Sequence, residues 1–186
     1  DQYREYANLL YAGDTDILSK LGNENTDWQK EIYRTGIGHD HNVSITGGAK
    51  NLPYRASIGY TGQNGILKTS SFDRVTGSIN LNPSFLDDYL KINFNAKGMY
   101  VKNRFADTGA VGNAVRFDPT HPVTTDEEPY ISETEGYWQW VTYNTEDGTF
   151  KSINADAPHN PVALLEQKDD RSKAWDLMGN IDIDYK

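Results

Sequence analysis

The chain has 186 residues, enough for one ordinary domain, and a formal net charge of −9 without a basic stripe, which argues against nucleic acid as a partner. It contains no cysteine, so disulfides and thiolate metal sites are excluded. Aromatic residues make up 12% of the chain, too many for a disordered linker, and no apolar run approaches the roughly 18 to 20 residues of a membrane-spanning helix.

Residues 1–36 carry helical patterns. The stretch DQYREYANLLYAG repeats apolar residues at helical spacing and meets a stop signal at Gly13. The stretch DTDILSKLG predicts a second short helix that ends at Gly22, and TDWQKEIYR opens with Thr26 and Gln29 at capping-box spacing. We therefore expect several short helices in this part of the chain.

From residue 37 onward the apolar residues recur with a period of two, which is typical of strands that have one apolar face. In chain order the alternating segments are HNVSITGG, YRASIGYTG, RVTGSINLN, YLKINFNAKGMYVKN and AWDLMGNIDIDYK. We predict four antiparallel strands within residues 37–104, a long loop over 105–173 and a fifth strand over 174–186. The last segment stops inside its alternating run, so we expect the chain to be an excerpt from a longer polypeptide.

Such alternation fits two architectures, a soluble antiparallel sandwich and a membrane barrel. Aromatic residues lie at both ends of the last apolar face, at Trp175 and Tyr185, and this stretch spans about 23 Å of membrane normal at a tilt near 45°. That height matches the apolar band of about 25 Å in outer-membrane barrels, whose loops are short on one side and long on the other. The pattern favours an all-β fold, an antiparallel transmembrane β-barrel of which these strands are a fragment, because five strands cannot close a barrel.

The same period assigns each strand residue to one face of the sheet. We expect the lipid-facing residues to include Ile58, Ile79, Ile92, Phe94 and Ile181. We expect the wet interior to be lined by Asn80, Asn93, Lys97 and Asp182.

Several segments, in order, resemble the SusC/RagA-like branch of TonB-dependent outer-membrane transporters. They are TDWQKEIYRTG, HNVSITGG, YRASIGYTGQNGI, FDPTHPV, NPVALLEQ and MGNIDIDY, and together they cover most of residues 26–186. The resemblance implies a plug inside a barrel of about 22 strands, in the outer membrane of a Gram-negative cell. It also implies import of glycans or peptides with a SusD-like surface lipoprotein as lid, energised by the TonB complex through parts of the protein that this chain lacks. Residues 1–36 and 105–173 would then be extracellular.

An aromatic stretch, GYWQWVTYN, lies in the long loop and holds the candidate substrate-binding residues Tyr137, Trp138, Trp140 and Tyr143. Exposed aromatic platforms bind sugar rings or partner proteins. The alternative is that the loop uses these rings to build a small core of its own. The stretch NPVALLEQ is interpreted as a structural anchor of the loop, with Pro161 fixing the chain.

Metal and catalytic sites are not expected. The HDH stretch at 39–41 puts two imidazoles on one strand face without a third ligand, and the loop carboxylates lack EF-hand spacing. These carboxylates are Asp126, Glu127, Glu128, Asp169 and Asp170. No catalytic motif stands out, so we expect neither an enzyme nor a cofactor. The alternative function is a soluble β-sandwich that binds carbohydrate, with Trp138 and Trp140 as its platform.

Overall fold

The computed structural model describes residues 2–186 and divides into two compact units. One unit, called the sheet unit here, contains residues 35–105 and 169–186. The other, called the helical unit, contains residues up to 34 together with 106–168. Among the described residues, no helix is long and apolar enough to cross a membrane.

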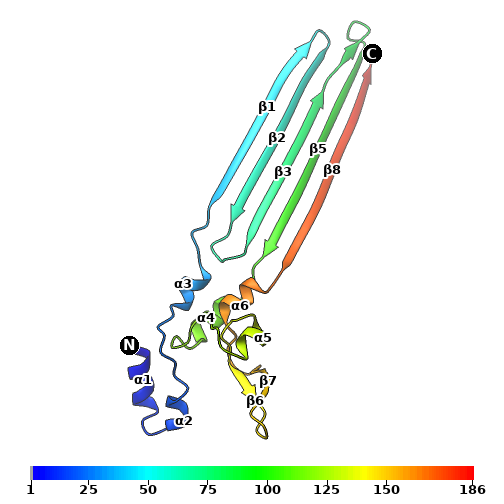
Figure 1. The fold of residues 1–186 in the computed structure, drawn as a ribbon. Coiled ribbons are helices and arrows are strands. Elements are labelled where there is room, and N and C mark those ends of the chain that lie inside the picture. The colour runs from blue at the N-terminus through cyan, green and yellow to red at the C-terminus, as the bar shows by residue number, and fades with distance from the viewer. Residues whose placement is uncertain (1) are drawn as a thin grey trace. The chain divides into compact units, whose positions relative to one another are not determined.

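The sheet unit is one antiparallel sheet in which the long strands follow the order β1-β2-β3-β5-β8 (Figure 1). The bounds of these strands are Gly38–Ala49 for β1, Leu52–Asn64 for β2, Ser71–Leu81 for β3, Leu90–Phe105 for β5 and Asp170–Tyr185 for β8. A two-residue strand, β4 (Ser84–Phe85), pairs with the start of β5. The predicted antiparallel, strand-rich fold is confirmed.

Tight connections join the strands at one end of the sheet. Between β1 and β2, Lys50 takes a left-handed conformation with φ of 47°, and before β5 three further residues do the same, Leu86, Asp87 and Asp88. Because the strands are antiparallel, the β2–β3 connection and the long segment between β5 and β8 join the sheet at its other end. The tight β1–β2 turn and the long segment between β5 and β8 therefore fall on opposite ends of the sheet.

The last strand starts earlier than the sequence pattern predicts. It begins at Asp170 rather than at residue 174, and β5 continues to Phe105, so the intervening segment is shorter than the predicted loop over 105–173. The register of the two strands runs without a break to the pair Phe105 and Asp170. The prediction was wrong here because ladder hydrogen bonds between backbones continue where the side-chain alternation ends.

The register assigns the apolar residues of five strands to one face, because directly paired residues of antiparallel strands point the same way. Three paired rows on this face are Val43–Ile58–Gly77–Gly98–Leu177, Ile45–Ala56–Ile79–Ala96–Gly179 and Gly47–Tyr54–Leu81–Phe94–Ile181. The opposite face carries Ser44–Ser57–Ser78–Lys97–Met178 and Thr46–Arg55–Asn80–Asn95–Asn180. Phe94 and Ile181 therefore lie on one face, and Asn93 and Asp182 on the other.

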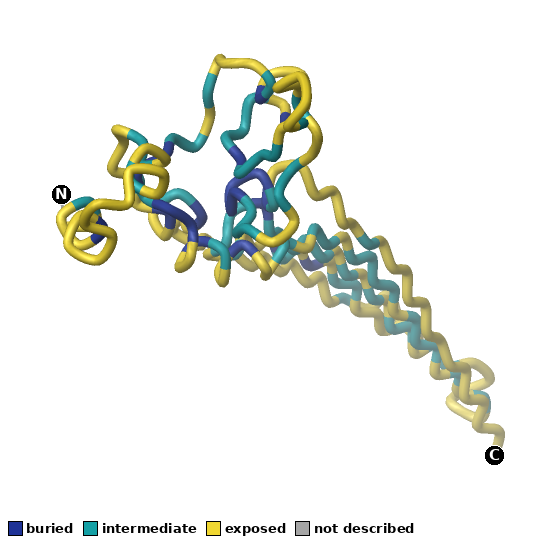
Figure 2. The backbone as a smooth tube through the Cα atoms, turned by 90° about the horizontal axis from the view of Figure 1, so that it is seen from below, coloured by how far each residue is buried: buried dark blue, intermediate teal, exposed yellow. Residues whose placement is uncertain are grey.

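The apolar face is uncovered within the sheet unit. The side chains of Val43, Leu177 and Ile181 are 61%, 84% and 62% exposed. Figure 2 shows the strands as exposed or intermediate along most of their length, while most of the buried backbone lies in the helical unit. A sheet with such a face requires a covering partner, because large contiguous apolar surfaces are not stable in water.

The helical unit combines six short helices with one hairpin. The helices are α1 (Gln2–Leu10), α2 (Thr15–Leu18), α3 (Trp28–Ile32), α4 (Gly109–Arg116), α5 (Tyr130–Thr134) and α6 (Pro161–Glu166), and the hairpin strands are β6 (Val141–Tyr143) and β7 (Phe150–Ile153). Its core is small, and Ile32 of α3 and Leu165 of α6 are fully buried in it.

Side-chain caps start three of these helices. Asp14 caps α2, Asp27 caps α3 and Asn160 caps α6, each by accepting a backbone N–H in the first turn. The predicted capping role of Thr26 was wrong. Its hydroxyl instead donates to the carbonyl of His121 at 2.7 Å, a partner that is distant in sequence.

Candidate functional site

An aromatic cluster lies in the helical unit around Trp138. Its indole ring stacks on the imidazole of His121, with ring centroids 3.6 Å apart and planes 13° apart. Trp140 meets it edge-on at 4.9 Å, and both Phe117 and Tyr130 lie at 5.9 Å. Trp28 extends the cluster by packing on Phe117 at 4.6 Å. We call these six residues the aromatic cluster.

The structure brings only part of the predicted aromatic site together. Trp138 and Trp140 are in contact, but their planes are 81° apart, so they do not form one flat platform. Tyr143 lies on β6 and is 49% exposed. Among the described residues, no ring contact joins Tyr137 or Tyr143 to the tryptophans. Trp138 and Trp140 are both half-buried, and Trp138 has four ring neighbours in the cluster. Tyr143 offers the more accessible aromatic surface.

A buried asparagine that the sequence pattern did not single out organises this cluster. The carboxamide nitrogen of Asn160 donates to the carbonyls of Val123 and Trp138 at 2.8 and 2.9 Å. Its carboxamide oxygen accepts from the backbone N–H groups of Val162 and Ala163 at the start of α6. One fully buried side chain thus ties together three segments of the unit. The signal available in the sequence was an asparagine directly before a proline, the usual start of a helix.

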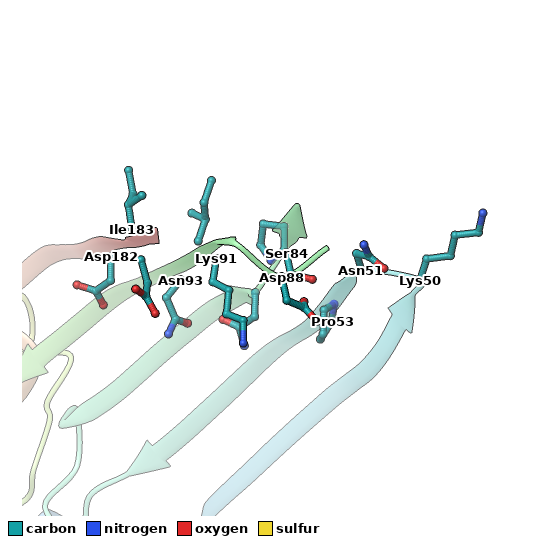
Figure 3. Close-up of a pocket in the computed structure, with 13 residues that line it drawn as sticks. Lys50, Asn51, Pro53, Ser84, Asp88, Lys91, Asn93, Asp182 and Ile183 are labelled. Atoms are coloured by element: carbon teal, nitrogen blue, oxygen red, sulfur yellow. The ribbon is translucent and has the colours of Figure 1, made fainter. Parts of the chain in front are cut away.

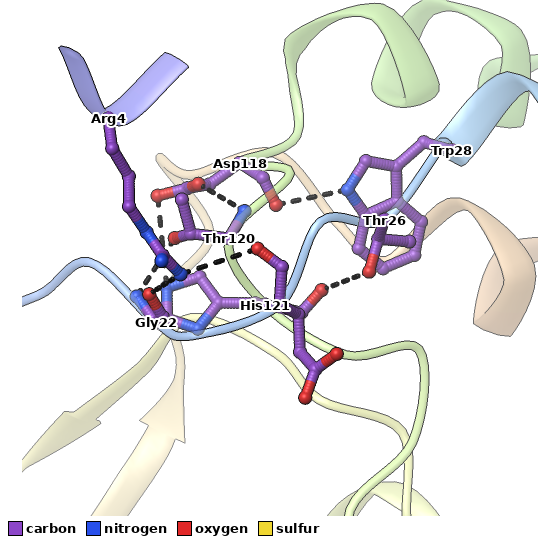
Figure 4. A network of polar contacts seen from close by, with 8 residues as sticks. Arg4, Gly22, Thr26, Trp28, Asp118, Thr120 and His121 are labelled. Atoms are coloured by element: carbon purple, nitrogen blue, oxygen red, sulfur yellow. Dashed lines mark hydrogen bonds and ion pairs between the residues drawn. The ribbon is translucent and has the colours of Figure 1, made fainter. Parts of the chain in front are cut away.

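The segment FDPTHPV anchors the start of α3 and the chain that precedes it (Figure 4). The indole of Trp28 donates to the carbonyl of Asp118 at 3.0 Å, and the backbone N–H of Gly22 donates to the hydroxyl of Thr120 at 2.9 Å. Arg4 in α1 donates to the carbonyl of Gly22. A side chain at Gly22 would collide with the carbonyl oxygen of Thr120, so glycine is required at this close approach.

Burial controls the ionisation of two cluster residues. Desolvation lowers the pKa of His121 below its ordinary value, and Asp118, whose Oδ2 lies 3.8 Å from Nε2, opposes this only in part. The Nε2 atom is buried and has no hydrogen-bond partner in the described structure. Burial, with smaller effects from Tyr143 and Glu127, raises the pKa of Tyr130 to about 12, so this phenol stays neutral at physiological pH.

The lowered pKa of His121 predicts a loss of stability in mild acid. Below the ordinary pKa of 6.5, His121 is protonated in the unfolded chain but stays largely neutral in the folded chain. The free energy of unfolding therefore falls as the pH decreases from that value. We expect hydrogen-exchange protection of residues 117–141 in the full-length protein to fall between about pH 7.5 and 5.5, after correction for intrinsic exchange.

Histidine substitutions separate the effect of His121 protonation from acid destabilisation caused by other groups. His121→Gln should remove most of the pH dependence, whereas His159→Gln should leave it unchanged, because His159 lies in the same unit outside the aromatic cluster. An equal loss of protection in the wild type and in His121→Gln would contradict the assignment.

The candidate metal ligands do not assemble into a site. Among the described residues, no group of three or more histidines and carboxylates is placed to hold a metal ion. The rings of His39 and His41 are 5.3 Å apart on an exposed strand end. Asp126, Glu127 and Glu128 are exposed, and Asp169 pairs with Arg171 at 2.5 Å.

The apolar face of the sheet forms a band with aromatic edges. At one end, the row His41–Tyr60–Val75–Tyr100–Trp175 crosses all five strands, and the rings of Tyr100 and Trp175 lie 4.4 Å apart. At the other end, Leu90 pairs with both Phe85 and Tyr185. From Trp175 to Tyr185 this band measures roughly 33 Å along the strand, or about 23 Å along an axis tilted by 45°. This is the height of a bilayer's apolar region in outer-membrane barrels.

A polar hollow of about 670 Å³ lies on the other face, near the tight turns. Figure 3 shows Lys91, Asn93 and Asp182 on one side of the sheet there, while Ile183 points to the opposite side. Lys91 pairs directly with Asp184, and Asn93 with Asp182. The hollow is a polar surface of mixed charge, in contrast to the apolar face behind it.

Comparison with known proteins gives a match that spans the whole chain. Over 191 aligned residues the chain is 52% identical to the TonB-dependent receptor SusC of Bacteroides thetaiotaomicron, and the alignment covers 100% of this chain. The chain belongs to the SusC-like TonB-dependent receptors. The resemblance noted in the sequence is thereby confirmed.

More distant TonB-dependent receptors match much of the chain as well. In Formosa agariphila, receptor P26 is 26% identical over 87% of the chain and receptor P3 is 28% identical over 89%. The chain spans 19%, 14% and 16% of the lengths of SusC, P26 and P3. Among solved structures, a closed state of the RagAB peptide importer matches with a TM-score of 0.49 and 19% identity, over 80% of this chain and 16% of that one. No family model matches the sequence.

Proposed function

We propose that this SusC-like chain forms part of the wall and the external surface of an outer-membrane importer in a Gram-negative cell. The observation that carries the proposal is the two-faced sheet, which has an exposed apolar band with aromatic edges on one face and polar side chains on the other. In this assignment Ile58, Ile79, Ile92, Phe94 and Ile181 face lipid, and Asn80, Asn93, Lys97 and Asp182 face the lumen.

The edges of the sheet support a larger barrel. Among the described residues, β1 pairs only with β2 and β8 only with β5, so each has one unpaired edge. Unpaired backbone groups are not tolerated in lipid. Further strands of the receptor would complete the ladder on both sides. The alternative of a soluble sandwich would need a second sheet over the apolar face, and the described residues of the sheet unit form a single sheet.

The lengths of the connections between strands indicate how the sheet would be oriented in the outer membrane. The segments of residues 1–37 and 106–169 both join the end of the sheet opposite the tight turns. Outer-membrane barrels place their long loops outside the cell and their short turns in the periplasm. We therefore assign the helical unit to the extracellular side, as part of the surface met by the substrate.

The substrate class and partners belong to the same proposal. A SusC-like receptor would import oligosaccharides or peptides together with a SusD-like lipoprotein, and the TonB complex would supply energy through other parts of the protein. Exposed apolar residues of the helical unit fit a partner-binding role, and they include Tyr6, Leu9, Val115, Ile131 and Tyr143. Tyr137, Trp138, Trp140 and Tyr143 remain the proposed substrate-contacting aromatics. Nothing in these roles involves catalysis.

Substitution of Trp140 and of the exposed Tyr143 tests the proposal. We expect the double variant Trp140→Ala/Tyr143→Ala to reduce uptake by the full-length receptor by about 2- to 10-fold, the loss expected for one or two aromatic contacts. Its level in the outer membrane should remain normal, because the contacts of Trp138 with His121, Phe117 and Tyr130 do not involve the substituted rings.

The matched control is Glu146→Ala, which changes an exposed residue in the same hairpin. Normal uptake by the aromatic double variant at wild-type membrane levels would remove these rings from the functional surface. If neither variant were recovered in the outer-membrane fraction, the proposed localisation would be wrong.

A further inference from the structure

Four cations lie on the apolar face of the sheet just beyond its aromatic edge. In the register of β5 and β8, Lys102 pairs directly with Lys173, and the next row on the same face pairs Arg104 with Arg171. The row Tyr100–Trp175 lies two residues from the lysine row on each strand, so all three rows point to one side. We call these four residues the basic rim.

This arrangement requires an explanation because like charges directly opposite each other destabilise a strand pair. The carboxylates nearby neutralise only part of the charge. Asp169 pairs with Arg171 at 2.5 Å, and Asp73, which pairs in register with Lys102, accepts a hydrogen bond from the phenol of Tyr60 at 2.8 Å. Among the described residues, no ion pair is formed by Lys102 or Lys173, and the Nε atom of Arg104 is buried without a hydrogen-bond partner.

The opposite end of the same face has no such cluster. Its last paired rows are Ile92–Ile183 and Leu90–Tyr185, and the charged residues of this region, Lys91 and Asp184, point to the other face. The basic rim is therefore confined to the end of the sheet that carries the long connections.

The position of the basic rim relative to the aromatic edge indicates which class of ligand it can reach. Aromatic side chains such as Trp175, which is 81% exposed, mark the boundary between the apolar region of a bilayer and its headgroups. One further row lies about 7 Å along the strand, or about 5 Å along the bilayer normal at a tilt of 45°. The cations are thus placed at headgroup depth on the face assigned to lipid.

We infer that the basic rim binds the phosphate groups of a phosphorylated lipid in the outer leaflet. Arginine forms paired hydrogen bonds to phosphate and lysine neutralises it as a point charge, so the four side chains together suit one or two phosphates. Bound phosphate removes the repulsion across the β5–β8 pair and supplies a partner for Arg104. This inference rests on the proposed function, because it requires the apolar face to be in lipid.

The test uses the full-length receptor in detergent and measures lipid binding by native mass spectrometry. The probes are lipid A that carries phosphate groups, the phosphate-free lipid with the same acyl chains, and inorganic phosphate. We expect the phosphorylated lipid to bind at least about tenfold more tightly than its phosphate-free counterpart, since a charge-assisted hydrogen bond contributes about that factor.

Paired substitutions assign the preference to the rim. Lys102→Gln/Lys173→Gln should reduce it by about tenfold, and Lys102→Arg/Lys173→Arg should retain it. The control Lys91→Gln/Lys97→Gln removes the same charge from the polar face of β5 and should have no effect. Heat-modifiable mobility on gels verifies that each variant is folded.

Three outcomes would overturn the inference. They are equal binding of the two lipids, an unchanged preference in Lys102→Gln/Lys173→Gln, and equal binding of inorganic phosphate, which would show an ordinary anion site. Any of these, found for a receptor that is present in the outer membrane and active in uptake, would leave the proposed function intact. Absence of the wild type from the membrane fraction would instead contradict the proposed function.

Discussion

Replacing Phe94 by arginine is expected to remove most of the folded receptor from the outer membrane. Phe94 pairs with Leu81 and Ile181 in a row close to the middle of the apolar band, six residues from Tyr100 and four from Leu90. An arginine near the midplane of a membrane barrel costs about 2 to 4 kcal/mol, against about zero to 1 kcal/mol near the interfaces. The measurement is the amount of heat-modifiable, membrane-inserted protein.

The neighbouring residue provides the control. Asn95 lies one position along the same strand, on the polar face, where it pairs with Asn80 and Asn180. Asn95→Arg adds the same side chain on the wet side and should leave the protein level close to that of the wild type. Equal losses from the two variants would show that the two faces of this sheet do not differ in their surroundings.

Replacing Asn160 by alanine is expected to unfold much of the helical unit while the sheet stays intact. The change removes the N-cap of α6 and leaves the buried N–H groups of Val162 and Ala163 without their partner. It also removes the hydrogen bonds from the carboxamide to the half-buried carbonyls of Val123 and Trp138, of which the first still accepts from the N–H of Trp138. Each unsatisfied buried group costs about 1 to 3 kcal/mol before the structure relaxes, so we expect a loss of about 3 to 5 kcal/mol in the local free energy of unfolding.

Limited proteolysis of the full-length receptor measures this effect. Residues 106–168 should become cleavable in Asn160→Ala, while the heat-modifiable mobility of the barrel persists. The matched control is Asn144→Ala, whose carboxamide donates only to the exposed hydroxyl of Thr149 in the hairpin turn. If Asn160→Ala resisted protease as well as this control does, the carboxamide would not organise the unit.

The sheet unit and the helical unit have different roles in the proposed receptor. The sheet unit presents an apolar band, an aromatic edge and the basic rim on one face, and amides and mixed charges on the other. The helical unit holds its aromatics through a buried amide and through contacts of the FDPTHPV segment. In the proposed receptor, the two faces of the sheet unit would govern membrane insertion and lipid contact. The aromatic residues of the helical unit would govern contact with the substrate at the external surface.

The sequence by itself determined the strands, their two faces and the family. Side-chain direction in a strand alternates with a period of two whatever the strand pairs with, so the assignment of Phe94 and Asn93 to opposite faces needed no tertiary information. The resemblance to SusC-like receptors rested on several short segments that occur in the same order. At 52% identity over the whole chain, such segments keep enough matching residues to be recognised one by one. The short helices before residue 36 were also readable, because their spacing and stop signals are local.

Only the tertiary structure decided which distant residues meet. His121 stacks on Trp138, and Asn160 bridges Val123 and Trp138, across separations along the chain that no local pattern encodes. The same is true of the basic rim, because Lys102 and Lys173 become neighbours only through the register of β5 with β8. Pairing with β5 also makes β8 begin at Asp170, before the predicted start at residue 174. Backbone hydrogen bonding depends on the partner strand, whereas the alternation of apolar and polar side chains does not show where that pairing begins.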